Sequence, residues 1–163
     1  MRCTLVVFLA LAGSCRGGGT EPPASMSRAA TTSARLGAVI VMATSQLVSS
    51  PAGASDVLVS ATLRNTGADR ATIIVSETTP LIVRLYPTRA PATSPVFTSR
   101  AAVTLLPRRI VLEPGATDSI TVFIPRDALS AAAVAAGRYR VTAELTVGGA
   151  RQPVIEAGEI AIP

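Results

Sequence analysis

Alternation of apolar and polar residues dominates the chain from residue 36 onward. Between Arg138 and Val147 every second residue is apolar, and the residues between them are arginine, threonine or glutamate. The stretches 57–64, 81–86 and 119–124 alternate with the same period. A period of two with one polar face is typical of half-buried strands in antiparallel sheets. The pattern therefore predicts an antiparallel β-sheet protein.

Turn residues separate the predicted strands. Residues 65–69 (NTGAD) and the Pro114-Gly115 pair each lie between two apolar runs, and 148–149 (GG) predicts a hairpin. The alternation shifts by one position near Gly158, which predicts a β-bulge there. About seven to nine short strands with regular turns favour an all-β, immunoglobulin-like antiparallel β-sandwich.

One stretch departs from the β pattern. Residues 126–136 are rich in alanine and end before Gly137, a residue suited to the end of a helix. We therefore expect one short helix near 126–136, with a loop of small residues as the alternative. Tyr139 follows directly. It is either a core residue or the tyrosine whose hydroxyl bonds back to the corner in immunoglobulin-like sandwiches.

The amino terminus reads as an export signal. Arg2 precedes an apolar run of about ten residues, which is half the length that a membrane span needs. The sequence 11–15 (LAGSC) resembles the lipobox of bacterial lipoproteins, in which small residues precede a cysteine that is lipidated. We expect a signal peptide at 1–14, cleavage before Cys15, and attachment to a membrane through lipid on Cys15. An ordinary secretory signal and a buried helix are the alternatives.

The residues after Cys15 predict a tether. Residues 15–35 form the lipidated cysteine and a linker rich in Gly, Ser, Thr, Ala and Pro, and the sandwich domain is expected at 36–163. A flexible linker of this length reaches about 25 Å on average. Arg16 stands where, in enterobacterial lipoproteins, an aspartate favours retention in the inner membrane. By that resemblance the protein is expected in the outer membrane, facing the periplasm.

The composition excludes several kinds of chemistry. All 15 basic residues are arginines, because the chain contains neither lysine nor histidine. It therefore lacks the histidine of Ser-His and Cys-His pairs and the lysine of Schiff bases and P-loops. The net charge is only +5 and the arginines are scattered, so nucleic-acid binding is not expected. We expect no cofactor and no metal site.

Carboxylates are the remaining candidates for catalysis. A glycoside hydrolase, for example, needs two of them facing each other across a cleft. Most lie in predicted turns or on polar strand faces, and no calcium-loop spacing occurs. We therefore expect no enzyme, with a carboxylate-based enzyme as the less favoured alternative. The acidic residues are Glu21, Asp56, Asp69, Glu77, Glu113, Asp118, Asp127, Glu144, Glu156 and Glu159.

Residues 87–109 are the least regular part of the predicted domain. This stretch combines prolines, arginines and one phenylalanine. Loops carried on a rigid sandwich often bind partners, so we interpret it as a possible partner loop, with a proline-stiffened strand connection as the alternative. Its candidate contact residues are Arg89, Phe97, Arg100, Arg108 and Arg109.

Three motifs carry a resemblance to known families. These are 59–67 (VSATLRNTG), 112–119 (LEPGATDS) and 137–145 (GRYRVTAEL). Together they resemble the BsuPI-type intracellular proteinase inhibitor domain, and also adhesion-type repeats such as CARDB, over residues 56–147. The resemblance implies an immunoglobulin-like fold and, by its first family, protease inhibition. Residues 88–107 lack the aromatic-rich middle of that family. The favoured hypothesis is a lipid-anchored, non-catalytic module that contacts another envelope protein.

Overall fold

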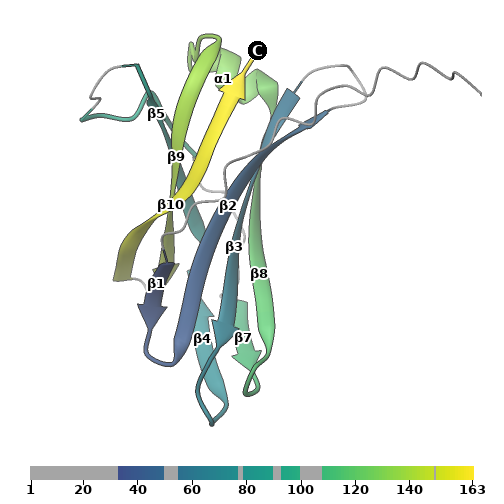
Figure 1. The fold of residues 1–163 in the computed structure, drawn as a ribbon, viewed down its shortest axis with the longest axis vertical. Helices are drawn as coiled ribbons and strands as arrows, with labels where there is room; N and C mark the ends of the chain where they lie inside the picture. Colours follow the sequence, from purple (N-terminus) through teal and green to yellow (C-terminus); the bar gives the residue numbers. More distant parts are fainter. Residues whose placement is uncertain (1–32, 50–54, 77–78, 90–92, 100–107, 149) are drawn as a thin grey trace, which may run out of the picture.

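The fold is an antiparallel β-sandwich of two sheets, seen in a computed structural model (Figure 1). The structure describes residues 33–49, 55–76, 79–89, 93–99, 108–148 and 150–163. Ten strands and one short helix lie within these residues. The predicted all-β class is therefore confirmed. The strands slightly exceed the expected number because β1 and β6 are too short to show an alternating pattern.

Four strands form sheet A, in the order β1-β2-β3-β8. All three neighbouring pairs are antiparallel. In the described part of the chain, β8 pairs with β3 on one side only, so it lies at an edge of the sheet. The bounds are β1 Ser33–Leu36, β2 Val39–Ser49, β3 Ser55–Asn65 and β8 Thr117–Ile124.

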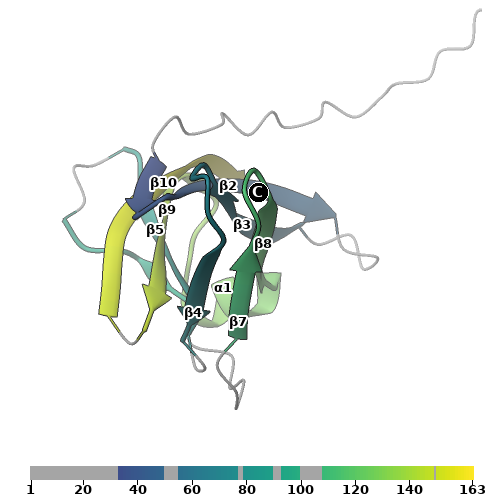
Figure 2. The ribbon, with the colours of Figure 1, turned by 90° about the horizontal axis from the view of Figure 1, so that it is seen from below.

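Six strands form sheet B, in the order β6-β5-β9-β4-β7, with β10 paired to β9. The ribbon of β4 and β7 projects at one end of the molecule, where the two strands lie side by side (Figure 2). The short strand β6 pairs with β5 at the opposite edge of the sheet. The bounds are β4 Ala71–Val75, β5 Leu81–Pro87, β6 Phe97–Thr98, β7 Arg108–Leu112, β9 Gly137–Val147 and β10 Ala150–Ile162.

The core between the sheets consists of aliphatic side chains and Tyr139. The inward positions of 57–64, 81–86 and 138–147 are buried as the alternation predicts, except Val147, which is half-buried, because each strand turns its apolar face toward the other sheet. The outer face of β9 differs from the expectation of a solvated polar face. Thr142 and Glu144 are buried there, flanked by side chains of β5 and β10.

The predicted turns and bulge are present. Gly115 has a φ of +77° in the turn between β7 and β8, a conformation that glycine adopts without strain. The register of β10 on β9 shifts between Glu156 and Gly158, and Gly158 has a φ of +99°. The bulge explains the change of parity, because one extra residue on β10 moves the following side chains to the other face.

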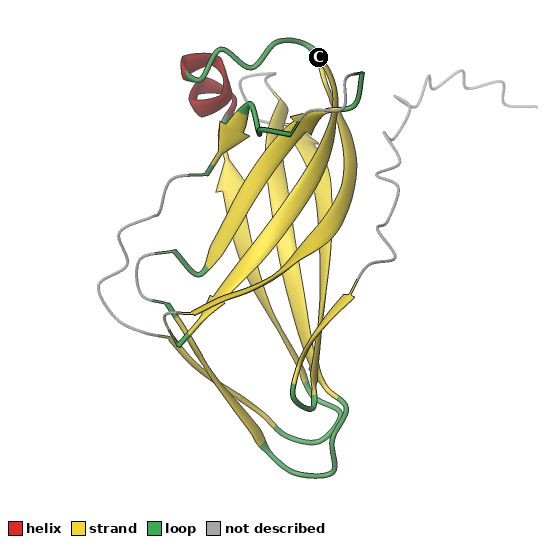
Figure 3. Cartoon of the chain, turned by 90° about the vertical axis from the view of Figure 1, so that its left-hand side faces the viewer, coloured by secondary structure: helices red, strands yellow, loops and turns green. Residues whose placement is uncertain are grey.

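The predicted helix is confirmed, but it is shorter than expected. Helix α1 spans Arg126–Ala131 and lies at one end of the sandwich (Figure 3). The prediction that it ends at Gly137 is wrong, because Ala133 adopts a left-handed φ of +55° and turns the chain earlier. The hydroxyl of Tyr139 donates a hydrogen bond to the carbonyl of Ala135 at 2.7 Å. Tyr139 is therefore both a core residue and the tyrosine that bonds back to the corner.

Strand β1 lies inside the predicted tether. Residues 33–35, which the prediction assigned to the linker, belong to β1. The predicted signal peptide, Cys15 and the rest of the linker lie outside the described residues. Within the described ranges, no helix has the length and apolar character needed to cross a membrane.

Candidate functional site

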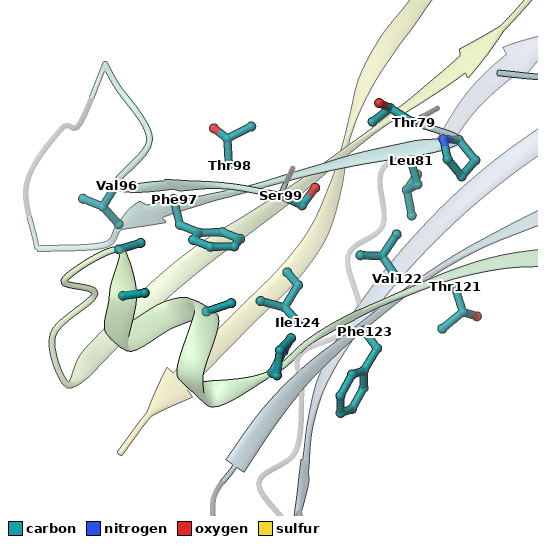
Figure 4. Close-up of a pocket in the computed structure, with 15 residues that line it drawn as sticks. Thr79, Leu81, Val96, Phe97, Thr98, Ser99, Thr121, Val122, Phe123 and Ile124 are labelled. Atoms are coloured by element: carbon teal, nitrogen blue, oxygen red, sulfur yellow. The ribbon is translucent and has the colours of Figure 1, made fainter. Parts of the chain in front are cut away.

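The two sheets close against each other on one side and remain apart on the other. On the closed side the hydroxyl of Ser45 in β2 donates to the carbonyl of Ala157 in β10 at 2.8 Å. On the open side a groove of about 960 Å³ lies between the β8 edge of sheet A and the β5–β6 edge of sheet B (Figure 4). We call this space the edge groove. Its lining residues are Thr79, Pro80, Leu81, Val96, Phe97, Thr98, Ser99, Thr121, Val122, Phe123, Ile124, Pro125, Ala128, Ala131 and Ala132.

Strand alternation determines which side chains enter the edge groove from β8. Val122 and Ile124 point into it, toward sheet B, whereas Thr121 and Phe123 point away from it (Figure 4). Phe123 therefore lies on the outer face of sheet A and is 54% exposed. It borders the groove through its backbone.

Strand β6 forms the opposite wall. Phe97 points into the edge groove, and Thr98 points away from it (Figure 4). Backbone hydrogen bonds hold the segment to β5 on both sides of Phe97: Val96 donates to the carbonyl of Leu85 at 2.9 Å, and Ser99 donates to that of Val83 at 2.8 Å. The position of Phe97 is therefore set by the sheet.

Helix α1 forms one end of the edge groove. Its first amide, that of Arg126, donates to a carboxylate oxygen of Asp56 in β3 at 2.8 Å. This bond satisfies one of the amides that a helix leaves free at its start, and it ties α1 to sheet A. Ala131 and Ala132 are exposed and line the groove.

The chemistry of the lining is apolar, with a few hydroxyls. None of the described lining residues is charged. The carboxylates that form ion pairs lie elsewhere, and the described residues contain no group of three or more side chains suited to hold a metal ion. The groove therefore gives a carboxylate-based enzyme no support. The pairs are Arg70–Glu113, Arg84–Glu144, Arg108–Asp118 and Arg140–Glu156.

The described residues of the predicted partner loop lie on different elements of the fold. Phe97 lines the edge groove. Arg108 and Arg109 lie on β7, and Arg108 is held by Asp118 at 2.8 Å. Arg89 is an exposed turn residue after β5, and Arg100 lies outside the described residues. Residues 97–98 form β6 and residues 108–109 begin β7, and the role of 87–109 as a partner loop stays a prediction.

Sequence reasoning missed most of the edge groove. Its walls come from β5, β6, β8 and α1, and no local pattern shows that these edges face each other. Phe123 carried one signal, since a phenylalanine stands there on the otherwise polar side of an alternating strand.

Comparison with known proteins assigns no family. No protein-family model and no curated protein match the chain. A solved protein from Archaeoglobus fulgidus is similar, with 12% identity, 74% of this chain and 95% of that chain covered, and a TM-score of 0.42. A β-glucosidase of intestinal bacteria involved in saponin metabolism has 18% identity, with 76% of this chain and 16% of that chain covered, and a TM-score of 0.37. Similarity of this degree assigns neither family nor function, and the BsuPI-type resemblance stays a prediction.

Proposed function

We propose that the protein is a lipid-anchored, non-catalytic module of the cell envelope, with an immunoglobulin-like sandwich that contacts another envelope protein. The edge groove carries the binding part of this proposal. It is an uncharged apolar recess on the surface of a chain that has 25 charged residues, and apolar recesses of this kind favour contact with a partner. The anchoring part is supported by the lipobox-like sequence that ends at Cys15.

The anchor is tested by labelling cells with a radioactive fatty acid. The unchanged chain and the Cys3→Ser variant are expected to carry label and to sediment with outer membranes. Cys15→Ser is expected to lose the label, because it lacks the thiol that is acylated. Cys3→Ser is the matched control, since that cysteine belongs to the leader. Label on the Cys15→Ser product would refute the proposed anchor.

Partner contact is tested by photocrosslinking in intact cells. A photoreactive amino acid at Phe97 or at Phe123, both in the lining of the edge groove, is expected to give one discrete adduct with an envelope protein that mass spectrometry identifies. The same amino acid at Thr44, on the outer face of sheet A, is the control position. If none of the positions Arg89, Phe97, Arg108, Arg109 and Phe123 gives an adduct, the binding role is wrong.

A further inference from the structure

The free edge of β8 adds a second recognition element to the apolar lining of the edge groove. Hydrogen bonds show which backbone groups of β8 face outward. Asn65 at the end of β3 donates its amide to the carbonyl of Ala116, which places the even-numbered residues of this strand toward β3. The odd-numbered ones face away. In agreement, the amide of Ser119 bonds to the Asp118 side chain and its carbonyl accepts from Arg108.

Thr121 and Phe123 are therefore the outward-facing residues of β8 beside the edge groove. Within the described part of the chain, no partner is found for their amides and carbonyls. Both residues are exposed. An unpaired row of amides and carbonyls at a sheet edge is a template for another extended chain, because only a strand offers complementary groups at the same spacing.

The side chains beside this edge indicate what such a strand must carry. Its inward residues would meet Val122 and Ile124 of β8 and Phe97 of β6, and none of the described residues of the groove lining is charged. A charged inward residue would lose its hydration without gaining a partner. On the outer face of sheet A, Phe123 would contact an outward-pointing side chain of the added strand.

We propose that the β8 edge binds an extended, uncharged segment of the partner polypeptide, with alternate apolar residues inserted into the edge groove. The added strand extends sheet A beyond β8 and is about six residues long, a common strand length. This inference rests on the proposed function and specifies the surface and the chemistry of the partner. A partner that binds elsewhere on the domain would leave the proposed function intact and overturn only this inference.

The test uses the isotope-labelled full chain and a blocked hexapeptide of alternating threonine and valine. Nuclear magnetic resonance follows the exchange of the Thr121 and Phe123 amides with solvent. Both are expected to exchange rapidly in the free chain and to become protected when the hexapeptide is added. The same peptide with glutamate in place of each valine is the control, and it is expected not to protect them.

Proline substitution separates backbone pairing from side-chain contact. Thr121→Pro removes an outward amide but none that bonds to β3, and it is expected to weaken hexapeptide binding about tenfold. Thr121→Ala keeps the outward amide but removes the side-chain methyl group and the hydroxyl that contacts Ser60, and it is expected to bind as the unchanged chain does. Thr117→Pro is the control for proline itself, because it also lies at an outward position of β8 but outside the groove lining.

A second pair of variants tests the groove without altering β8. Ala131→Glu places a charge in the edge groove and is expected to reduce binding. Ser130→Glu, on the same helix but outside the groove lining, is expected to leave binding unchanged. Equal binding by Thr121→Pro and the unchanged chain would overturn the proposal. Protection of the Thr121 and Phe123 amides before peptide is added would also overturn it. Protection that does not depend on protein concentration would mean that the chain covers its own edge. Protection that rises with protein concentration would mean that a second copy covers it.

Discussion

Asn65 joins three segments of the chain through one side chain. The side-chain nitrogen Nδ2 of Asn65 donates to the carbonyls of Asp69 at 2.8 Å and Leu112 at 3.0 Å. Its side-chain oxygen Oδ1 accepts from the backbone amide of Gly67 at 2.9 Å. Asn65 is fully buried, so water cannot easily replace its side chain as the hydrogen-bond donor to the carbonyl of Leu112. Asn65 thus fixes the turn after β3 against the end of β7.

We predict that Asn65→Ala lowers the free energy of unfolding by about 3 kcal/mol, because three hydrogen bonds are lost and buried groups stay unpaired. Urea denaturation measures this change. Asn65→Asp keeps the acceptor for Gly67 but faces two carbonyls with a carboxylate, so it is expected to destabilise at least as strongly. A loss below about 0.5 kcal/mol for Asn65→Ala would show that the turn holds without this network.

The hydrogen bond of the Tyr139 hydroxyl can be tested by removing a single oxygen atom. Tyr139→Phe removes only the hydroxyl that donates to the carbonyl of Ala135, and the ring stays in the core. We predict a loss of about 1 kcal/mol in the free energy of unfolding, measured by thermal or urea denaturation. Tyr86→Phe, on the half-exposed outer face of β5, is the control and is expected to change stability less.

The bulge in β10 is a feature of the element and depends on one backbone conformation. At a φ of +99°, Gly158 occupies a backbone region that residues with a Cβ rarely adopt. We predict that Gly158→Ala lowers the free energy of unfolding by about 1–2 kcal/mol.

Gly37, at the turn between β1 and β2, provides the comparison. Its φ is +59°, in the left-handed region that asparagine tolerates, and a Cβ there would meet open space. Gly37→Asn is therefore expected to cost less than about 0.5 kcal/mol. If Gly158→Ala is as mild as Gly37→Asn in parallel urea titrations, the bulge does not require glycine.

The elements show which part of the architecture follows from sequence alone. The strands around Val59, Val83 and Val141 were predictable, because period two and burial on one face are local properties. The end of α1 was not, because Ala133 takes a left-handed conformation that alanine rarely adopts.

The edge groove was not predictable either. Phe97 was identified as a candidate, but its groove partners Val122 and Ile124 read only as core positions of another strand. Which strands form the edges of the two sheets depends on long-range pairing, and that pairing leaves no periodic signal in the chain.

The whole molecule holds its two sheets together without a cross-link. Both cysteines, Cys3 and Cys15, precede residue 33, so the sandwich from β1 to β10 contains none. Its stability therefore comes from the burial of aliphatic side chains and from the hydrogen bonds of the two sheets. Exported domains of modest size often use disulfides for this purpose.

A direct consequence is that the redox state of the solution should not alter the stability of the domain. We predict that dithiothreitol shifts the midpoint of thermal unfolding by less than about 1 °C, since no covalent link constrains the unfolded chain between β1 and β10. Cys15→Ser is expected to unfold at the same midpoint, because Cys15 precedes the first strand of the sandwich in the sequence. A drop of several degrees on reduction of the unchanged chain, absent in Cys15→Ser, would instead mean that Cys15 links two copies and that this link stabilises the sandwich.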